Sequence, residues 1–346
     1  MDALSVVGGG IAGLALAACL DPGRFHVTIH ERRNEQPPVE TSLAMWPEAQ
    51  RALDEVGILP AVRAAGSDLG GMALRDGSGT VLLTARAPGV IGVSRADLLR
   101  LLDAAVAASV ARAYGPVASL PLPGLVVGAD GVHSIVRRSV WGERSRARLS
   151  PYLALRGLID QPVPPGGGGE YWGRGQLFGI APASRGRTYW YASYRSGLGP
   201  AGIDVEEALA LTRTRLSGRA PGMDRILLAA TPGTTLAQRV WTVPFPGSYQ
   251  RDGAVLVGDA AHGMTPNLGR GACEALIDAV TLAGLLNTCP LPEALRAYNR
   301  RRLLRSQVLR AASSAMARVA LAECTQPLRD GLLRMVGRGG GGPGAG

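Results

Sequence analysis

Leu4-Ser5-Val6-Val7-Gly8-Gly9-Gly10-Ile11-Ala12-Gly13 is the stretch that decides the fold of this chain of 346 residues. Its apolar start predicts a buried strand, and its glycines predict a turn that leads into a helix over residues 14–20. A second buried strand is predicted over residues 26–30. Strand, turn, helix and strand within about 30 residues are typical of a dinucleotide-binding βαβ unit.

Each glycine of the G-x-G-x-x-G turn has a separate physical reason. Gly8 permits the tight turn, Gly10 lets the backbone approach a pyrophosphate, and Gly13 lets the helix lie close to the strand. The phosphates would lie at the helix N-terminus, where free N–H groups and the helix dipole favour negative charge. Ile11 and Ala12 therefore belong to the predicted cofactor site.

Glu31 ends the second predicted strand, 18 residues after Gly13. A carboxylate there would accept hydrogen bonds from the ribose hydroxyls of a dinucleotide. A G-x-G-x-x-G sequence alone is weak, because glycine-rich turns without a ligand also occur. The strand, the helix and Glu31 together favour a dinucleotide site, which NAD as well as FAD would fit.

A second turn of this kind lies far along the chain, after a buried strand predicted over residues 255–258. Asp259 follows this strand, and the segment Thr265 to Gly271 leads into another helix. An aspartate in this place would bind the ribityl or pyrophosphate region of a flavin. The helix N-terminus near Gly271 would stabilise negative charge on the reduced ring. We therefore interpret the dinucleotide as FAD, with an ordinary βα turn of an NAD enzyme as the alternative.

The remaining patterns predict an α/β fold. Helices are predicted over 47–62, 95–108, 205–216 and 271–286, with two more between residues 293 and 336. A hairpin is predicted over 72–83, a short buried strand over 125–128, and longer strands over 152–158, 170–181, 188–194 and 236–243. The long strands predict an antiparallel sheet inserted between two nucleotide-binding pieces.

This organisation predicts a Rossmann-like FAD-binding domain with an inserted sheet and C-terminal helices. The FAD-binding domain would comprise residues 1–70, 95–150 and 245–290. The substrate domain would comprise residues 71–94 and 151–244, followed by C-terminal helices over 291–337 and a disordered, glycine-rich tail over 338–346.

Three motifs resemble those of the single-component FAD-dependent monooxygenases. They are Gly8 to Gly13, Gly128-Ala129-Asp130-Gly131-Val132-His133-Ser134, and Gly258-Asp259-Ala260-Ala261-His262 with Pro266. This family includes p-hydroxybenzoate hydroxylase, salicylate hydroxylase and zeaxanthin epoxidase. The similarity covers about residues 1–305, and the three motifs in this order and spacing are highly specific.

The resemblance implies a role for each matching residue. The glycines would bind the FAD pyrophosphate, Asp130 and Gly131 would bind the pyrophosphates of FAD and NAD(P)H, and Asp259 the ribityl chain. The predicted cofactor-binding residues are Gly8, Gly10, Ile11, Ala12, Gly13, Glu31, Arg32, Arg95, Asp130, Gly131, Asp259, Pro266, Gly269, Gly271 and Ala272. Tyr298 and Arg301 match the family's helix after the last motif.

The activity implied by the resemblance is oxygen insertion. NADH or NADPH would reduce FAD, O2 would form a flavin C4a-hydroperoxide, and one oxygen atom would pass to an aromatic ring or an alkene. Because the flavin carries this chemistry, no catalytic side chain is assigned, although Pro266 and Gly271 would line the flavin. The alternatives are a flavin-dependent reductase or dehydrogenase, and a FAD-binding protein with impaired turnover.

Two segments depart from the family pattern. Residues 113–125 are short where the family usually has two or more extra strands, which raises the question of how tightly this chain binds FAD. The sequence Arg270-Gly271-Ala272-Cys273-Glu274 replaces the Gln-Gly-x-Asn of many hydroxylases and is closer to the epoxidase-like branch.

The substrate is expected between the inserted sheet and the flavin. Candidate contacts are Arg156, Trp172, Tyr191, Phe245 and Met264, each of which also fits core packing. Arg156 would meet a carboxylate or phenolate of the substrate, and a structural ion pair is an equal alternative.

Composition excludes several other functions. All 37 basic residues are Arg, so mechanisms that need a lysine are excluded: Schiff-base chemistry, a Walker A site, and the lysine-dependent flavin halogenases. The net charge of +10 is dispersed and aromatics are only 5%, which argues against nucleic-acid binding. No metal-binding spacing occurs among Cys and His.

The expected partners are a small-molecule substrate and O2. No apolar run reaches the length of a membrane span and no signal peptide opens the chain, so we expect a cytoplasmic monomer or homodimer. From Glu293 onward there are ten Arg against three acids. We interpret this as a solvated helix face, with docking to a membrane surface or a carrier protein as the alternative.

Overall fold

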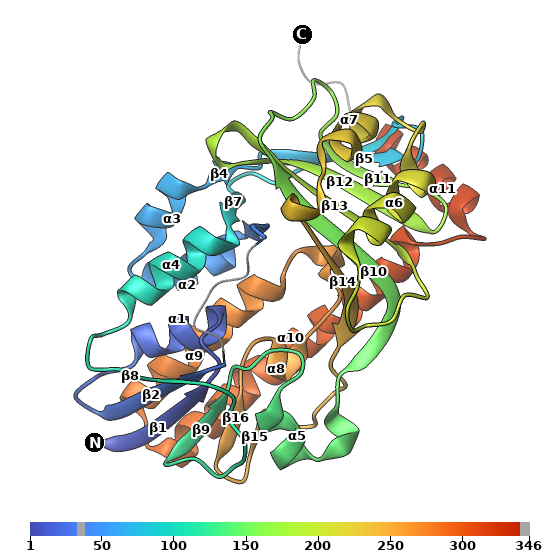
Figure 1. Ribbon diagram of the computed structural model, residues 1–346. Coiled ribbons are helices and arrows are strands. Elements are labelled where there is room, and N and C mark those ends of the chain that lie inside the picture. Colours follow the sequence, from blue (N-terminus) through green and yellow to red (C-terminus); the bar gives the residue numbers. More distant parts are fainter. Residues whose placement is uncertain (33–38, 340–346) are drawn as a thin grey trace.

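The computed structural model of the chain describes residues 1–32 and 39–339. Two main sheets lie in separate parts of the molecule, and the long helix α10 (Leu291–Ala320) runs from one to the other (Figure 1). Near its start, the hydroxyl of Tyr298 donates a hydrogen bond to the carbonyl of Leu256 in the first sheet, at 3.0 Å. Near its end, Ala317 and Ala320 pack with Tyr152 of the second sheet.

The first sheet has six strands in the order β15-β16-β9-β1-β2-β8. All its pairings are parallel except that of β15 with β16. The strands are β1 (Asp2–Val7), β2 (Phe25–Glu31), β8 (Ala111–Tyr114), β9 (Leu125–Gly128), β15 (Gln250–Arg251) and β16 (Ala254–Leu256). A parallel sheet of this kind, covered by helices, confirms the predicted α/β class.

The second sheet has seven strands in the order β14-β10-β13-β12-β11-β5-β6, antiparallel except between β11 and β5. These strands are β5 (Gly71–Asp76), β6 (Val81–Arg86), β10 (Arg148–Ile159), β11 (Gly169–Trp172), β12 (Gln176–Ala183), β13 (Arg187–Arg195) and β14 (Thr235–Thr242). A small third sheet, in the order β3-β7-β4, consists of β3 (Ser42–Met45), β7 (Ile91–Ser94) and β4 (Ser67–Asp68).

Helices pack on both main sheets. They are α1 (Ile11–Cys19), α2 (Pro47–Glu55), α3 (Leu59–Ala65), α4 (Arg95–Ala105), α5 (Ile135–Trp141), α6 (Val205–Leu216), α7 (Pro221–Ala229), α8 (Asp259–His262), α9 (Gly271–Thr288), α10 and α11 (Gln326–Gly339). Short 3-10 segments lie at η1 (Glu143–Ser145), η2 (Ser184–Gly186), η3 (Pro232–Thr234) and η4 (Pro266–Leu268). One face of the seven-stranded sheet packs on α6 and α7, and the other packs on the end of α10 and on α11.

Two predicted elements are each divided in the structure. The helix predicted over 47–62 is α2 and α3, because the chain turns at Gly57 in the left-handed region (φ 84°). The N–H of Ile58 bonds to the carbonyl of Leu53 and that of Gly57 to Asp54, which is a Schellman ending. The strand predicted over 170–181 is β11 and β12, separated by a tight turn at residues 173–175.

Several short elements were missed. The sequence pattern did not predict β3, β4, β7, α5 or α7, and β8 lies partly in the segment 113–125 that was expected to be short. β8 pairs with β2 at the edge of the six-stranded sheet. The helix predicted over 95–108 ends at Ala105. The missed elements have two to nine residues, too few for a periodic pattern to identify them.

The predicted division into a FAD-binding domain and a substrate domain stays a prediction. The pairing of the strands can be compared with it. β5 and β6 hydrogen-bond within the same sheet as β10 to β14, whereas β7, also assigned to the substrate domain, belongs to the three-stranded sheet. The predicted disordered tail begins at residue 338, but α11 extends through Gly339, and the rest of the tail lies outside the described residues.

The fold places α1 in unusually close contact with the end of β1. A Cβ atom added at Gly13 would lie 1.9 Å from the carbonyl oxygen of Gly8. We expect Gly13→Ala to lower the free energy of unfolding by about 2–3 kcal/mol, because the helix must move away from the turn. Denaturant unfolding of the purified protein measures this.

The matched control is Gly284→Ala in the exposed middle of α9, where an added Cβ meets nothing within 4 Å. This variant should gain up to about 1 kcal/mol, because alanine is the better helix former. Equal stability of the two variants would contradict the steric argument.

Candidate functional site

The start of α1 presents free backbone donors at the end of β1. The first intrahelical hydrogen bond runs from the N–H of Leu14 to the carbonyl of Gly10 (2.9 Å), so the N–H groups of Ile11, Ala12 and Gly13 precede it. A Cβ atom at Gly10 would meet nothing within 4 Å, so the space beside it is open. This arrangement can accept a pyrophosphate on the helix N-terminus.

Glu31 lies at the end of β2 and contacts the glycine turn. Its Oε2 accepts a hydrogen bond from the N–H of Gly9 at 2.7 Å. The carboxylate therefore holds the glycine turn in place, on the side where the ribose of a dinucleotide is predicted to bind. Arg32 follows on the surface, close enough to His133 for its charge to help lower the pKa of that imidazole, after burial and the nearby Arg137 and Arg138.

Asp130 follows β9 and caps the start of α5. Its Oδ2 accepts hydrogen bonds from the N–H groups of Ile135 (2.6 Å) and Val136 (3.3 Å). Its Oδ1 is buried and has no hydrogen-bond partner within the described part of the chain. Burial raises the pKa of Asp130, and the hydrogen bonds that it accepts oppose this rise. One oxygen is thus structural, and the other is a candidate for a contact with a cofactor beside Gly131.

Asp259 begins α8 with its side chain exposed. A Cβ at Gly271, the first residue of α9, would lie 3.9 Å from its Oδ1, so the carboxylate faces the N-terminus of that helix. Pro266 and Gly269 lie exposed on the connecting turn, and Ala272 is half-buried in the first turn of α9. The second motif therefore brings an exposed carboxylate to a free helix N-terminus.

Arg95, at the start of α4, lies within electrostatic range of this turn. Burial lowers the pKa of Arg95, the charge of Asp259 opposes this, and the charge of Arg156 lowers the pKa further. Arg95 therefore lies where the Asp259 turn and the seven-stranded sheet both act on it. The structure brings together residues that are 61 and 164 positions apart in the sequence (95 to 156 and 95 to 259).

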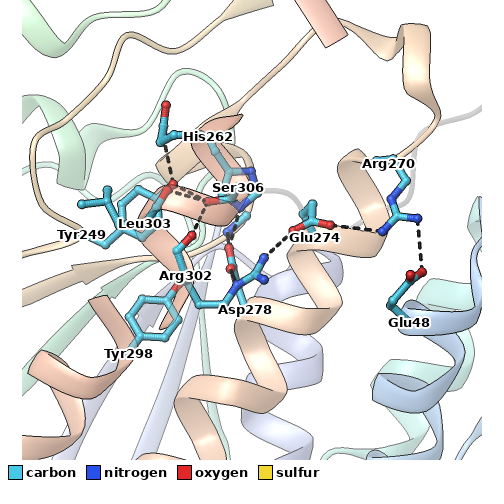
Figure 2. A network of polar contacts seen from close by, with 12 residues as sticks. Glu48, Tyr249, His262, Arg270, Glu274, Asp278, Tyr298, Arg302, Leu303 and Ser306 are labelled. Carbon is cyan, nitrogen blue, oxygen red and sulfur yellow. Dashed lines mark hydrogen bonds and ion pairs between the residues drawn. The ribbon is translucent and has the colours of Figure 1, made fainter. Parts of the chain in front are cut away.

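A chain of alternating charges lies beneath the second motif. Figure 2 shows it extending from Glu48, on α2, to His262, on α8. In order, the side chains are Glu48, Arg270, Glu274, Arg302, Asp278 and His262. Sequence reasoning missed this network, and it named Arg301 where Arg302 is the buried arginine and Arg301 is exposed.

Asp278 is the centre of this network. It accepts hydrogen bonds from Nε2 of His262 (2.6 Å), Nε of Arg302 (2.6 Å) and the N–H of Gly258 (2.8 Å). Burial alone would raise the pKa of Asp278, but the charges of Arg302 and His262 lower it to about 2. Burial alone would lower the pKa of His262, but the carboxylate of Asp278 outweighs burial and raises it. A charged core, in which Asp278 accepts three hydrogen bonds, therefore holds the turn that presents Asp259.

The exposed end of the network lies against Trp46. The guanidinium of Arg270 lies 5.5 Å from the centre of the Trp46 ring and also contacts Glu48. A Cβ at Gly269 would lie 4.0 Å from Nε1 of Trp46. Sequence analysis singled out neither Trp46 nor Glu48, and nothing in a local pattern connects them to residue 270.

The five predicted substrate contacts have different environments. Arg156 and Tyr191 lie opposite each other on β10 and β13, half-buried. Trp172 is almost fully buried, with the guanidinium of Arg329 over its ring, and it packs with α10 and α11 as a core residue. Phe245 is exposed and lies beyond β14 rather than in the sheet, and Met264 is half-buried between α8 and η4.

Sequence analysis also gave no sign of a polar group around Glu170, which lies beside Tyr191 on the seven-stranded sheet. Oε1 of Glu170 accepts a hydrogen bond from the hydroxyl of Tyr191 (3.1 Å), and Oε2 accepts one from Nε1 of Trp172 (2.8 Å). The Tyr191 ring reaches Glu170 across Gly179, where an added Cβ would lie 2.0 Å from the ring. Burial raises the pKa of Glu170, and both hydrogen bonds oppose this rise.

Tyr189 lies beside Tyr191, with ring centres 5.6 Å apart. Burial raises the pKa of Tyr189, and the charge of Arg156 and a hydrogen bond with it oppose this rise. Alternation at period 2 along β13 would have found Tyr189, because it faces the same side as Tyr191.

The family described as FAD binding domain matches residues 123–313. Aurachin C monooxygenase/isomerase of Stigmatella aurantiaca is 30% identical over 361 aligned residues, covering 96% of this chain and 93% of the relative. This chain belongs to the FAD-dependent monooxygenase family.

A further relative and a solved structure support the assignment. A FAD-dependent urate hydroxylase of Klebsiella pneumoniae is 29% identical over 342 aligned residues, covering 88% of each chain. The crystal structure of Klebsiella pneumoniae HpxO complexed with FAD and uric acid has a TM-score of 0.85 and 25% identity, over 96% of this chain and 93% of that one. The predicted family, cofactor and class of enzyme are confirmed: the protein is a FAD-dependent monooxygenase.

The residues of this monooxygenase fit FAD. The glycine turn offers free N–H groups with open space at Gly10, Asp130 has an unpartnered buried oxygen, and Asp259 is exposed beside the start of α9. No helix in residues 1–32 or 39–339 is long and apolar enough to cross a membrane. Within the same residues, no group of three His, Cys, Asp or Glu side chains could hold a metal ion.

Gly10→Ala tests the proposed pyrophosphate site. The added methyl group would occupy the open space beside the start of α1, so the dissociation constant of FAD should rise about tenfold or more. The stability of the apoprotein should not change, because the Cβ meets no protein atom within 4 Å. Titration of the apoprotein with FAD, followed by flavin fluorescence, measures the first quantity and thermal unfolding the second. Unchanged FAD affinity would place the pyrophosphate elsewhere.

Arg302→Met tests the charged core. It leaves the buried carboxylates of Glu274 and Asp278 without their shared partner, so the free energy of unfolding should fall by about 3–5 kcal/mol. Glu48→Gln, at the exposed end of the same network, is the control and should change it by less than about 1 kcal/mol. Similar losses in the two variants would show that burial does not decide the effect.

Proposed function

We propose that this monooxygenase uses NADH or NADPH and O2 to insert one oxygen atom into an aromatic or alkene small molecule. The observation that supports this is the position of Arg95, whose pKa responds both to Asp259 of the cofactor turn and to Arg156 of the inserted sheet. We infer that the polar face of β10 and β13 lies next to the cofactor site. A substrate held against Arg156 would lie beside the flavin.

Arg156 is the residue that we propose to bind the substrate. Its Nε is buried and has no hydrogen-bond partner among the described residues. A buried, unpaired guanidinium N–H is costly unless a ligand satisfies it. An oxygen anion or carbonyl on an aromatic ring would supply this partner and would be matched by the positive charge. This favours an aromatic substrate with an acidic hydroxyl or a ring carbonyl over a purely apolar alkene.

Tyr189, Tyr191 and Glu170 would orient that ring. The two phenol rings form one side of the region next to Arg156, and Glu170 holds the hydroxyl of Tyr191. The raised pKa values of both tyrosines keep them neutral, so they can donate as well as accept hydrogen bonds. We propose Phe245 and Met264 as apolar contacts on the cofactor side, and we leave Trp172 out because it is core.

When bound, FAD supplies the redox chemistry: it takes electrons from the nicotinamide and activates O2. The side chains of this protein bind and orient both ligands. Asp259 and the N-terminus of α9 would hold the ribityl chain and the negative edge of the ring, and Pro266, Gly269, Gly271 and Ala272 would line it. Packed tyrosines exclude water, which protects reactive species from side reactions.

We also propose a cytoplasmic location and a monomer or homodimer. The predicted roles of Arg32 and Asp130 near the FAD and NAD(P)H phosphates, and the two-domain division, belong to the same proposal.

A product screen tests the reaction. The purified holoenzyme is incubated with NADH or NADPH, O2 and separate panels of hydroxylated aromatics, ring carbonyl compounds and polyenes. We expect substrate-dependent O2 consumption and a product heavier by one oxygen atom, labelled when 18O2 is supplied. Turnover that continues unchanged without O2 would overturn the proposal in favour of a reductase or dehydrogenase. Bound FAD without any nicotinamide oxidation would indicate impaired turnover.

Arg156→Met tests the substrate contact. Loss of a charge-assisted hydrogen bond should raise KM for an anionic aromatic substrate by about 10- to 100-fold, while the FAD content stays that of the wild type. Arg148→Met is the control at the exposed start of the same strand and should leave KM unchanged. Steady-state kinetics measures both, and an equal KM in the two variants would remove Arg156 from the substrate site.

A further inference from the structure

Helix α11 is attached to the molecule through polar side chains. Arg329 and Asp330 are buried and paired at 2.8 Å, with Asp330 only 2% exposed. Arg329 donates hydrogen bonds to the carbonyls of Ala320 (2.7 Å) and Trp172 (2.9 Å). A surface helix usually buries its apolar side and exposes its polar side. In α11 the buried side is largely polar.

The outer side of α11 is apolar. Leu328, Leu332, Met335 and Val336 are all exposed, with Leu328 at 77% and Met335 at 68%. Their spacing of four, three and one residues places them on one face of the helix. Figure 1 shows α11 at the outer edge of the molecule, beside the seven-stranded sheet. Within residues 1–32 and 39–339, this face therefore has no partner.

The preceding helix, α10, repeats this arrangement. Leu304 (70% exposed), Val308 and Val319 lie on the outside, and the exposed Ala311 and Ala315 lie between them. Positions 304, 308, 311, 315 and 319 share one face of a helix. We call the apolar residues of both helices the C-terminal face: Leu304, Val308, Ala311, Ala315, Val319, Leu328, Leu332, Met335 and Val336.

Exposed arginines border the apolar stripe of α10 on both sides. Arg301 and Arg305 lie along one side, while Arg300 and Arg318, five helical turns apart, lie along the other. Acidic residues do not balance them: Asp330 is buried with Arg329, and Glu323 pairs with Arg195. Only Glu293, at the start of α10, remains among the acids of these two helices and their connection. The α10 part of the C-terminal face is therefore apolar along its centre and positive at its borders.

We propose that the C-terminal face docks on the surface of an anionic lipid bilayer. Exposed apolar side chains flanked by arginines are the pattern of a helix that lies in the membrane interface, with guanidinium groups extending to the lipid phosphates. A second copy of the chain would bring the same positive charge to the contact, which disfavours a symmetric dimer through this face. Docking goes beyond the oxygen-insertion reaction and does not depend on it.

Co-sedimentation of the holoenzyme with vesicles tests the proposal. We expect binding to vesicles of phosphatidylglycerol and phosphatidylcholine, at least about tenfold weaker binding to pure phosphatidylcholine, and release at high salt. Leu304→Gln with Val308→Gln, and Leu328→Gln with Leu332→Gln, each remove two apolar side chains. At least one of these double variants should bind about tenfold less tightly or worse.

The control variant is Leu211→Gln with Leu228→Gln. Both leucines are exposed, but they lie on α6 and α7, which cover the opposite face of the seven-stranded sheet. This variant should bind vesicles like the wild type, and FAD absorbance should show that all variants are folded. Absence of binding to anionic vesicles, or equal binding by all variants, would overturn the proposal. A dimer in sedimentation equilibrium that the α10 or α11 variant dissociates would assign the face to a second copy instead.

Discussion

The carboxylate of Asp278 is the interaction on which the cofactor side of this monooxygenase depends. It binds the backbone after β16, the imidazole of α8 and the guanidinium of Arg302 on α10, while itself belonging to α9. Three stretches that lie apart in the chain, residues 258–262, Asp278 and Arg302, are thus joined at one buried group. The exposed carboxylate of Asp259 can be presented at a fixed place because the turn that bears it is anchored on its inner side. Paired charges, rather than apolar packing alone, define this position.

The parts of the molecule that the sequence predicted well are those encoded locally. The first glycine turn, the strands and helix around it, and the Asp259 turn each depend on residues close together in the chain. The split of the helix over 47–62 at Gly57, and of the strand over 170–181 at its glycines, shows the limit of periodicity when a turn is short. Flanking apolar residues continued the pattern across each turn.

The contacts that complete the site are long-range, and no local pattern predicts them. Glu48 meets Arg270 across 222 positions, and Tyr191 meets Glu170 across the backbone of a third strand. Arg301 and Arg302 show how sensitive such inference is, because one residue along a helix turns the side chain by about 100°. The matching motif identified the helix, but only packing showed which arginine faces inward. Trp172 was named for its aromatic ring, and its burial under α11 became visible only in three dimensions.

Helix α10 has 30 residues and is about 45 Å long, and it packs on both main sheets. Its length therefore fixes how far apart the cofactor side and the substrate side of the enzyme lie. Inserting or deleting one residue in its middle would rotate one end against the other, so that Tyr298 and Ala317 could no longer both face inward. Loops of this protein can change length during evolution at little cost. A change in the length of α10 keeps both of its ends facing inward only when it adds or removes complete helical turns. Because the two ligand sites lie towards opposite ends of α10, the number of residues in this helix sets the distance between them.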